Sequence, residues 1–219
     1  MKINQFNNRI KLIDYINSYN KRFDKIFLIT SKQIIKLYPF IKKSKVDIII
    51  CKEGEICKSI NEYKKIIDHM LIQGCNKQSL IIGFGGGTIT DLVGFIGSTY
   101  MRGIKHVFIP STLLCMVDAS IGGKTALNFK NIRNLIGTFN NPYEIIVYFN
   151  FIKTLDYNEL INGYAEVIKY ALIMDYELFE LLEKNISFLI QSTTNKNIKP
   201  IIEKCINHKL EIVSQDKYD

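Results

Sequence analysis

Residues 79–91, SLIIGFGGGTITD, decide the fold of this chain, because an apolar strand pattern runs directly into glycines and then into a helix pattern. Ser79–Phe84 predicts a buried strand, and residues 88–100 predict a helix. Glycines at such a junction let backbone amides approach a phosphate at the positive end of the helix dipole. The G-x-G-x-x-G spacing is incomplete, because Thr88 or Thr90 fills its last position. The motif alone leaves nucleotide binding and a tight structural turn equally open.

The sequence on either side of this stretch alternates strand patterns with helix patterns. Further apolar runs predict strands at residues 25–30, 46–51, 106–110 and 144–149. Helix patterns cover residues 8–19, 31–43 and 61–73, and Ser59 is placed to cap the last of these. This alternation predicts an α/β domain with a parallel, Rossmann-like sheet and helices on both of its faces.

From residue 157 onwards the pattern becomes entirely helical. Apolar residues recur at helical spacing through AEVIKYALIMDYELFELLEKN and again through IKPIIEKCINHKLEIVSQD. The intervening TTNKNIKP, residues 193–200, predicts a surface loop. We therefore expect an α/β domain at residues 1–154, followed by the start of an all-helical domain at residues 155–219.

Composition excludes several classes of protein. The 219 residues are 47% hydrophobic, which is enough to bury a core, and the five cysteines contain no CxxC pair. Neither a disulfide framework nor a zinc ribbon is expected, and no apolar run approaches the length of a membrane span. The net charge is +8, but the lysines are scattered, which favours a solvated basic surface over nucleic-acid binding. We expect a cytoplasmic protein with neither a membrane nor a nucleic acid as partner.

A second glycine cluster, GGKT at Gly122–Thr125, is similar to part of a P-loop. A P-loop also requires a glycine five positions before Gly123, where this chain has Asp118, so P-loop chemistry is excluded. Asp118 and Lys124 then flank a flexible turn, an arrangement that suits hydrogen bonding to a polyhydroxy anionic ligand. The alternative is a hairpin turn with a solvated Lys124.

Glu166 and Lys169 are three residues apart and so share one face of a predicted helix. Their neighbours are apolar nearly all round, which predicts a buried helix whose charges are paired or bind a ligand. The alternative is an exposed ion pair of little consequence. The histidines, His69, His106 and His208, are not spaced as a metal pair, and structural roles are expected for the first two.

Five motifs in order carry a family resemblance: GGGTITDLVGF, YMRG, IPSTLLCMVDASIGGKTALN, RNLIGTF and GYAEVIKYALIMD. Together they resemble 3-dehydroquinate synthase over about residues 25–219. The resemblance implies a phosphorus-oxygen lyase of the shikimate pathway, which converts the seven-carbon sugar acid phosphate DAHP to 3-dehydroquinate. Bound NAD oxidises a ring hydroxyl, phosphate is eliminated, and NAD is regenerated within the turnover, while a divalent metal, zinc or cobalt, polarises oxygens.

The resemblance assigns the cofactor site residue by residue. The segment after the second predicted strand would lie along the ribose and adenine, the glycine cluster would hold the pyrophosphate, and later segments would complete the site. In chain order these residues are Glu53, Gly54, Glu55, Lys58, Gly87, Thr88, Ile89, Thr90, Asp91, Ser111, Thr112, Lys124, Arg133, Phe151, Ile152, Lys153 and Thr154.

The resemblance likewise assigns the substrate and metal contacts. DAHP would contact Asp118, Lys124, Asn134, Lys169 and Lys209, and Arg102 would reach the phosphate of substrate bound to the partner subunit of a homodimer. Glu166 would be the first metal ligand.

Four positions depart from the family pattern. Thr90 replaces a Gly and Ser111 a Thr, changes that alter size and hydrogen bonding little. Arg133 replaces a Lys and keeps its charge but not its geometry. Tyr148 replaces an Asp, and nothing in the sequence accounts for that change.

The family pattern also continues beyond residue 219, with a further Arg, a GHxxxH segment and another His that supply two metal ligands and a second substrate contact. The expectation is a C-terminally truncated synthase. Its alternatives are one half of a split enzyme that needs a complementing C-terminal half, and a non-catalytic NAD-binding fragment with an exposed apolar face on residues 157–213.

Overall fold

The computed structural model describes residues 1–191 and 198–216, with side chains from 185 to 191 left out of the description. Residues 193–197 of the predicted surface loop therefore lie outside the described residues. Residues 198–200 of the same segment form the first turn of a helix rather than a loop.

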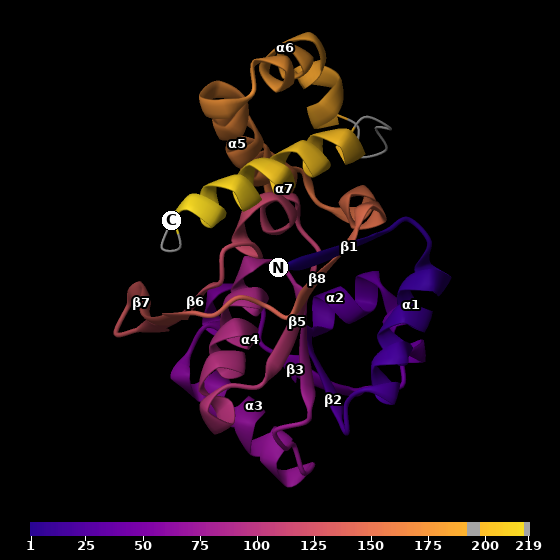
Figure 1. The fold of residues 1–219 in the computed structure, drawn as a ribbon, viewed down its shortest axis with the longest axis vertical. Helices are drawn as coiled ribbons and strands as arrows, with labels where there is room; N and C mark the ends of the chain where they lie inside the picture. Colours follow the sequence, from indigo (N-terminus) through magenta and orange to yellow (C-terminus); the bar gives the residue numbers. More distant parts are fainter. Residues whose placement is uncertain (192–197, 217–219) are drawn as a thin grey trace.

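A parallel sheet is the centre of the fold, as the alternation of patterns predicted (Figure 1). Within the described residues its strands are β1 (Lys2–Phe6), β2 (Ile26–Ser31), β3 (Asp47–Cys51), β4 (Leu80–Gly85), β5 (Lys105–Pro110) and β8 (Glu144–Tyr148), in the order β1-β8-β5-β4-β2-β3. Every residue of β2, β4 and β8 is buried, because helices cover both faces of a parallel sheet. The predicted α/β fold is confirmed.

Helices pack on both faces of this sheet. Figure 1 shows α1 (Arg9–Ser18) and α2 (Lys32–Leu37) on one side, and α3 (Ile60–Ile72) and α4 (Gly87–Thr99) on the other. Ser59 caps α3 as predicted, since its hydroxyl accepts a hydrogen bond from the Glu62 amide. The single helix expected at residues 31–43 is wrong, because Pro39 ends α2 and starts a separate 3₁₀ turn, η2 (Pro39–Lys43).

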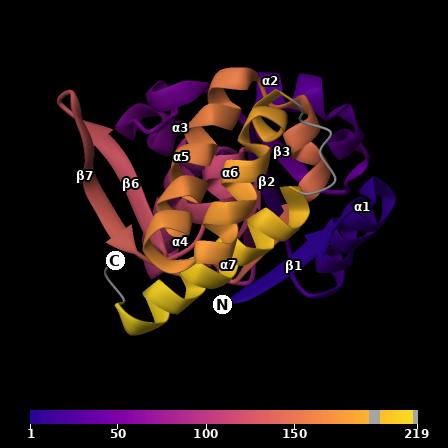
Figure 2. The same ribbon diagram turned by 90° about the horizontal axis from the view of Figure 1, so that it is seen from above.

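Three strands were not predicted. β1 is a partly exposed edge strand whose residues KINQF have no apolar run, and it pairs with β8 from the opposite end of the chain. β6 (Lys124–Phe129) and β7 (Ile132–Phe139) form an antiparallel hairpin that extends away from the body of the molecule (Figure 2). The hairpin turn is at Lys130 and Asn131, both with positive φ, so the alternative of a hairpin turn at GGKT is wrong. Gly122 and Gly123, also with positive φ, form the bend that leads into β6.

A buried carboxylate joins the edge strand to the sheet. Glu144, at the start of β8, is fully buried and accepts hydrogen bonds from the hydroxyls of Tyr15 (2.6 Å) and Tyr19 (2.8 Å) and from the Asn4 amide. Lys2 lies 3.5 Å from the same group. Burial, followed by this carboxylate, raises the pKa of Tyr19 far above its ordinary value. These contacts offset the cost of burying the Glu144 carboxylate, and they hold α1 and β1 against the sheet.

The histidines and cysteines take structural places. His106 is buried in β5, and burial lowers its pKa to about 4, so the ring is neutral at physiological pH. His69 on α3 pairs with Asp47 on β3 at 3.2 Å. All five cysteines of the sequence fall in the part that the structure describes, and they are buried free thiols.

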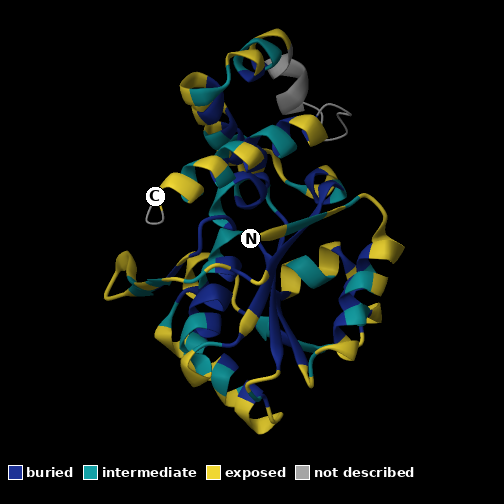
Figure 3. Ribbon diagram, in the orientation of Figure 1, coloured by how far each residue is buried: buried dark blue, intermediate teal, exposed yellow. Residues whose placement is uncertain are grey.

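The remaining helices lie at one end of the sheet: α5 (Tyr157–Met174), α6 (Tyr176–Gln191) and α7 (Ile198–Gln215). The prediction that the helix carrying Glu166 is buried all round is wrong. One side of α5 is buried, but Leu172, Ile173 and, just beyond the helix, Tyr176 are 65–73% exposed (Figure 3). None of the helices in the described residues combines the length and the apolar character that crossing a membrane requires.

Candidate functional site: a crevice at the carboxyl edge of the sheet

The sheet topology predicts one ligand-binding crevice, at the carboxyl edge of the sheet. The chain runs outward from β2 to β3, and then returns to the other side of β2 to continue through β4 and β5. In open α/β sheets, ligands bind outside the carboxyl ends of the strands at such a reversal. The segments that follow β3, β4, β5 and β8 all reach this edge, and they contain most of the predicted site residues.

Gly85, Gly86 and Gly87 carry no side chains where β4 joins the N-terminus of α4, and this junction is called the glycine cradle below. Gly86 is the N-cap residue of α4, and a Cβ atom placed on it would lie 3.2 Å from Thr112 Cγ2. With no side chain at the cap, the first turn of α4 presents its backbone amides and the positive end of its dipole. Gly87–Asp91 make up this first turn, as predicted. Gly86 itself was not predicted, although the triple glycine contained the signal.

Side chains of this first turn divide into two groups. Thr88 and Asp91 are half-buried at the crevice, whereas Ile89 and Thr90 are buried in the core. The Thr90 hydroxyl donates to the Gly87 carbonyl at 3.0 Å, so it stabilises the turn from within. The backbone amides of Ile89 and Thr90 donate to the Gly86 carbonyl at 3.1 and 3.2 Å, so the amides of Gly87 and Thr88, at the first two positions of the helix, are the ones suited to contact a ligand.

Ser111 adds a polar group beside the cradle. Its amide donates to the Gly85 carbonyl at 2.8 Å, which fixes the segment after β5 against the glycines. Its hydroxyl is buried and has no hydrogen-bond partner among the described residues. A buried polar atom without a partner is costly in a folded protein, so this hydroxyl fits the contact of a bound polar ligand. Thr112 accepts from the Cys115 amide and so begins the π-helical segment η5 (Cys115–Ala119).

Asp118 lies on η5 and is held by groups from the helical part. Lys209 on α7 is buried, and its Nζ lies 2.9 Å from Asp118 Oδ1. Tyr170 on α5 donates its hydroxyl to the same oxygen at 3.2 Å. Burial, reinforced by Asp118, raises the pKa of Tyr170. Sequence reasoning predicted Asp118 and Lys209 but missed Tyr170.

This cluster reaches the cradle through close backbone packing. A Cβ on Gly87 would lie 3.4 Å from the Ala119 side chain, next to Asp118. A Cβ on Gly163 would lie 2.5 Å from Leu113 Cβ, so α5 approaches the segment after β5 as closely as a glycine permits. Tyr170 is thereby brought to Asp118, and the Asp118 cluster forms one wall of the crevice.

A second buried charge cluster forms the opposite wall. Lys58 follows the 3₁₀ turn η3 (Gly54–Cys57), and its Nζ lies 2.5 Å from Asp91 Oδ2 on α4. The same ammonium donates to the side-chain oxygen of Asn134 on β7. Burial raises the pKa of Asp91, and the charge of Lys58 opposes this shift. Three residues predicted on separate segments are thus brought together.

The other predicted cofactor residues surround this wall. Glu53 accepts from the Gln33 amide, and Glu55 accepts from the side chain of Asn128 on β6. Lys124 and Arg133 are exposed on the hairpin strands. Gly54 lies between the two glutamates, in the turn itself.

Phe151–Thr154 lie in η6 (Phe149–Thr154), directly after β8. Phe151 and Ile152 are buried in the core, whereas Lys153 and Thr154 are exposed. The Phe151 ring packs edge-on against Tyr148, with ring centroids 4.8 Å apart. This packing gives Tyr148 an apolar role at the end of β8.

Arg102 does not join the crevice of its own chain. It lies in η4 (Tyr100–Arg102), beyond the C-terminus of α4, whereas the cradle lies at the N-terminus of that helix. The 13 residues of α4 span about 20 Å at about 1.5 Å per residue. The structure therefore separates Arg102 from the other predicted substrate residues.

Glu166 and Lys169 form an ion pair on α5. Lys169 Nζ lies 2.5 Å from Glu166 Oε2, but that oxygen is buried and accepts no hydrogen bond within the described residues. A carboxylate is a common metal ligand, although a metal ion at this oxygen would have to displace the Lys169 ammonium. However, the described residues contain no cluster of three or more His, Cys, Asp or Glu side chains able to hold a metal. The residues present do not complete a metal centre.

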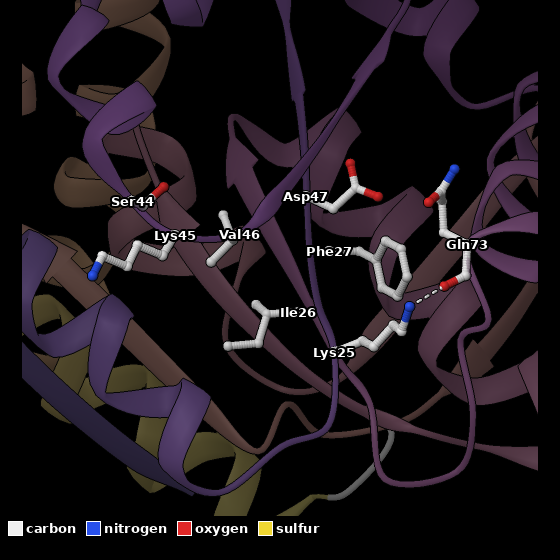
Figure 4. Close-up of a pocket in the computed structure, with 8 residues that line it drawn as sticks. All are labelled: Lys25, Ile26, Phe27, Ser44, Lys45, Val46, Asp47 and Gln73. Atoms are coloured by element: carbon white, nitrogen blue, oxygen red, sulfur yellow. Dashed lines mark hydrogen bonds between the residues drawn. The ribbon is translucent and has the colours of Figure 1, made fainter.

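A cavity of about 410 Å³ lies at the other edge of the sheet, away from all of these residues (Figure 4). Residues at the amino ends of β2 and β3 line it, together with Gln73, whose carbonyl accepts from Lys25 at 2.6 Å. Because ligands bind at the carboxyl edge of such sheets, we do not assign this cavity to the site.

The position of α7, and with it of Lys209, depends on Asp175. The Asp175 carboxylate is hydrogen-bonded to Lys204 and His208 of α7, each at 2.9 Å. Burial opposes its ionisation, but these hydrogen bonds and that of the Leu178 amide outweigh burial and lower its pKa to about 2.

We expect Asp175→Asn to lower the melting temperature at about pH 6 by several degrees and to have little effect near pH 2. The folded-state pKa lies below the ordinary value of 3.8, so the carboxylate stabilises the fold above about pH 4 and loses this effect as the pH falls to about 2. Thermal melts of both proteins across this range measure the difference. An equal loss at both ends of the range would contradict the charge-based origin.

Comparisons with known proteins agree with this arrangement. Family models match the chain in two parts, 3-dehydroquinate synthase N-terminal at residues 48–162 and 3-dehydroquinate synthase C-terminal at residues 163–219. The 3-dehydroquinate synthase of Dictyoglomus thermophilum is 40% identical over 207 residues, covering 93% of this chain and 57% of the relative. That of Clostridium tetani is 35% identical over 208 residues, covering 91% and 54%. The chain thus spans about half the length of these relatives.

Solved structures show the same fold. The 2-epi-5-epi-valiolone synthase from Streptomyces hygroscopicus, solved with NAD⁺ and Zn²⁺, superposes with a TM-score of 0.87 at 26% identity, covering all of this chain and 62% of that one. A 2-deoxy-scyllo-inosose synthase superposes with a TM-score of 0.84 at 23% identity, covering 99% and 60%, which shows the fold alone. With its glycine cradle and both charged walls inside the span that the two family models match, this chain belongs to the 3-dehydroquinate synthase family.

Proposed function

We propose that this chain is the NAD-binding part of a 3-dehydroquinate synthase, which converts DAHP to 3-dehydroquinate with elimination of phosphate. The observation that carries the proposal is the glycine cradle at the N-terminus of α4 between two ion pairs, Lys58–Asp91 and Lys209–Asp118, each made of a buried lysine and a half-buried aspartate. A helix N-terminus suits a pyrophosphate, and paired charges at its sides suit a polyhydroxy anion.

NAD would lie across the carboxyl edge. Its pyrophosphate would lie at Gly87–Asp91, meeting the backbone amides of Gly87 and Thr88, and the Ser111 hydroxyl, which has no partner among the described residues, would serve as a polar contact beside the cradle. The residues Glu53, Gly54, Glu55 and Lys58 and the segment Phe151–Thr154 would complete the contact. When bound, NAD supplies reversible hydride transfer. The chain's own part is to hold cofactor and substrate in register.

DAHP would lie against the Asp118 wall. Lys209 and Tyr170 hold the Asp118 carboxylate in one orientation, which limits its reorganisation when a substrate hydroxyl binds. Lys124, Asn134 and Lys169 would supply further contacts from the hairpin and α5. Arg102, remote from this crevice, would act on substrate in the second subunit of a homodimer.

A divalent metal, zinc or cobalt, is proposed for the complete enzyme, with Glu166 as the ligand from this chain. The described residues supply no further ligand cluster, so the remaining ligands would come from residues beyond the matched span. We retain residue 155 as the proposed domain boundary and the cytoplasm as the proposed location. A complementing C-terminal segment would pack against the helical part.

The test separates cofactor binding from turnover. Isothermal titration calorimetry with NAD is expected to give saturable binding by the purified chain. The chain alone is expected to release no phosphate from DAHP in the presence of NAD and Zn²⁺, because its metal ligands are incomplete. Adding a separately produced C-terminal segment of the Dictyoglomus thermophilum relative is expected to give phosphate release from DAHP. The absence of any NAD binding would overturn the proposal.

A further inference from the structure

We propose that Lys58 is a positioning residue that locks the β6–β7 hairpin, and with it Asn134, to the cofactor cradle. The proposal rests on the proposed function for its cofactor. Only 3% of Lys58 is exposed, and its ammonium bridges Asp91 on the first turn of α4 and Asn134 on β7. One buried cation thus connects the cradle to an element that the fold otherwise leaves projecting.

The outer part of the hairpin needs such a connection because its side chains are exposed. An isolated pair of strands is marginally stable in water, and residues 130–135 at its tip are exposed. The base of the hairpin packs on α4, where Thr125, Ala126 and Leu127 are buried, so the outer part relies on a few polar contacts with the α/β body. The Thr138 hydroxyl donates to the Ser98 hydroxyl on α4 at 2.8 Å, and the backbone N–H of Asn128 donates to the backbone carbonyl of Lys58 at 2.7 Å. Both the backbone and the side chain of Lys58 therefore hold the hairpin.

Asn134 depends on this lock for its orientation. Its backbone is in the left-handed region, with φ of 56°, a conformation that asparagine adopts more readily than most residues. The backbone N–H of Asn134 donates to the Asn128 side chain at 2.9 Å, and the Lys58 ammonium donates to the side-chain oxygen of Asn134. Asn128 thus holds the backbone of Asn134, and Lys58 holds its side chain. Only the contact with Lys58 connects Asn134 to the cradle, through Asp91.

The charge of Lys58 is required as well as its reach. Asp91 is half-buried, with 21% of its side chain exposed, and it needs a nearby cation to stay ionised at low cost. Charge-assisted hydrogen bonds are about twice as strong as neutral ones, so an apolar replacement loses both restraints. Arginine keeps the charge but has a planar fork instead of a compact ammonium, so it restores the lock only in part. Cofactor bound at the cradle would steady Asp91 and, through Lys58, Asn134.

Hydrogen–deuterium exchange of the cofactor-free chain tests the lock directly. We expect Lys58→Met to speed exchange of the amides of residues 128–136, the outer part of the hairpin, at least about tenfold, while α1 exchanges as in the wild type. Lys58→Arg is expected to fall between the two. The matched control is Lys64→Met on the exposed side of α3, which should leave the hairpin unchanged. Hairpin exchange within about twofold of the wild type, or acceleration that includes α1 equally, overturns the proposal.

Asn134→Gly provides a second test that tolerates the left-handed backbone and leaves the Lys58–Asp91 pair in place. It is expected to speed hairpin exchange in the same way, and an unchanged hairpin overturns the proposal even if Lys58→Met does not fold. In the wild type, added NAD should slow hairpin exchange further, and in Asn134→Gly it should bind but not slow it. NAD slowing hairpin exchange equally in both proteins overturns the coupling. If the wild type binds no NAD by calorimetry, the proposed function fails, whereas the cofactor-free comparison still decides the role of Lys58.

Discussion

Gly86→Val is expected to reduce NAD affinity at least about a hundredfold, equivalent to about 2.7 kcal/mol of binding free energy. A Cβ at this position already lies 3.2 Å from Thr112 Cγ2, so the branched methyl groups of valine must occupy the space above the first turn of α4. That space is where the proposed pyrophosphate meets the backbone amides. Calorimetric titration with NAD measures the loss.

The backbone of Gly86 is extended, with φ of −81° and ψ of −172°, so valine introduces no backbone strain at this position. The fold should therefore survive, which a thermal melt of the variant checks. Gly86→Ala adds only the Cβ and should cause a smaller loss, about tenfold. Unchanged NAD affinity in a folded Gly86→Val protein would show that the cofactor does not use this cradle.

Glu144→Ala is expected to destabilise the fold by about 4 kcal/mol, because it removes the acceptor shared by the buried Tyr19 hydroxyl and by the half-buried side chains of Tyr15 and Asn4. All three donate to this fully buried carboxylate, and Tyr19 among them is itself fully buried, so its hydroxyl would lose its acceptor away from solvent. For a chain of this length the loss corresponds to a fall in melting temperature of roughly 8–16 °C. Thermal and urea melts of the two proteins measure it.

A matched surface change calibrates this effect. Glu180→Ala removes an exposed carboxylate that lies 3.6 Å from Lys184, and such pairs contribute about 0–1 kcal/mol. Tyr19→Phe removes one of the three donors and should cost about 1 kcal/mol, since the other donors still compensate Glu144. A loss for Glu144→Ala no larger than that for Glu180→Ala would mean that the buried network does not hold the edge strand.

The central strands and helices could be predicted because their signals are local. Ser79–Phe84 is apolar throughout, as a strand covered on both faces must be, and the glycines after it mark the start of α4. The same reasoning failed for β1, where KINQF shows no strand periodicity and the partner strand is about 140 residues away. It also failed for β6, which has three consecutive buried residues, and for β7, which is mostly exposed, because neither strand shows the alternation of buried and exposed residues that reveals a strand.

Site prediction divided in the same way. The lone charges Asp118, Lys124 and Glu166 stood out against apolar neighbours, and the family resemblance supplied roles for them. Sequence could not show that Tyr170 reaches Asp118, nor that one ammonium, that of Lys58, serves both Asp91 and Asn134. These contacts join residues that are 33 to 76 positions apart in the sequence, and the spacing of apolar residues gives no information about contacts over such separations.

The amino-acid sequence by itself determined the parallel sheet, the glycine turn at the head of α4 and membership of the family, because each depends on short runs of adjacent residues. The tertiary structure alone decided which charges meet. Packing of α5 and α7 against η5 pairs Lys209 with Asp118, and docking of the hairpin on α4 brings Asn134 to Lys58. Burial then makes each pairing necessary, since a charge removed from water must find a partner wherever the chain places one.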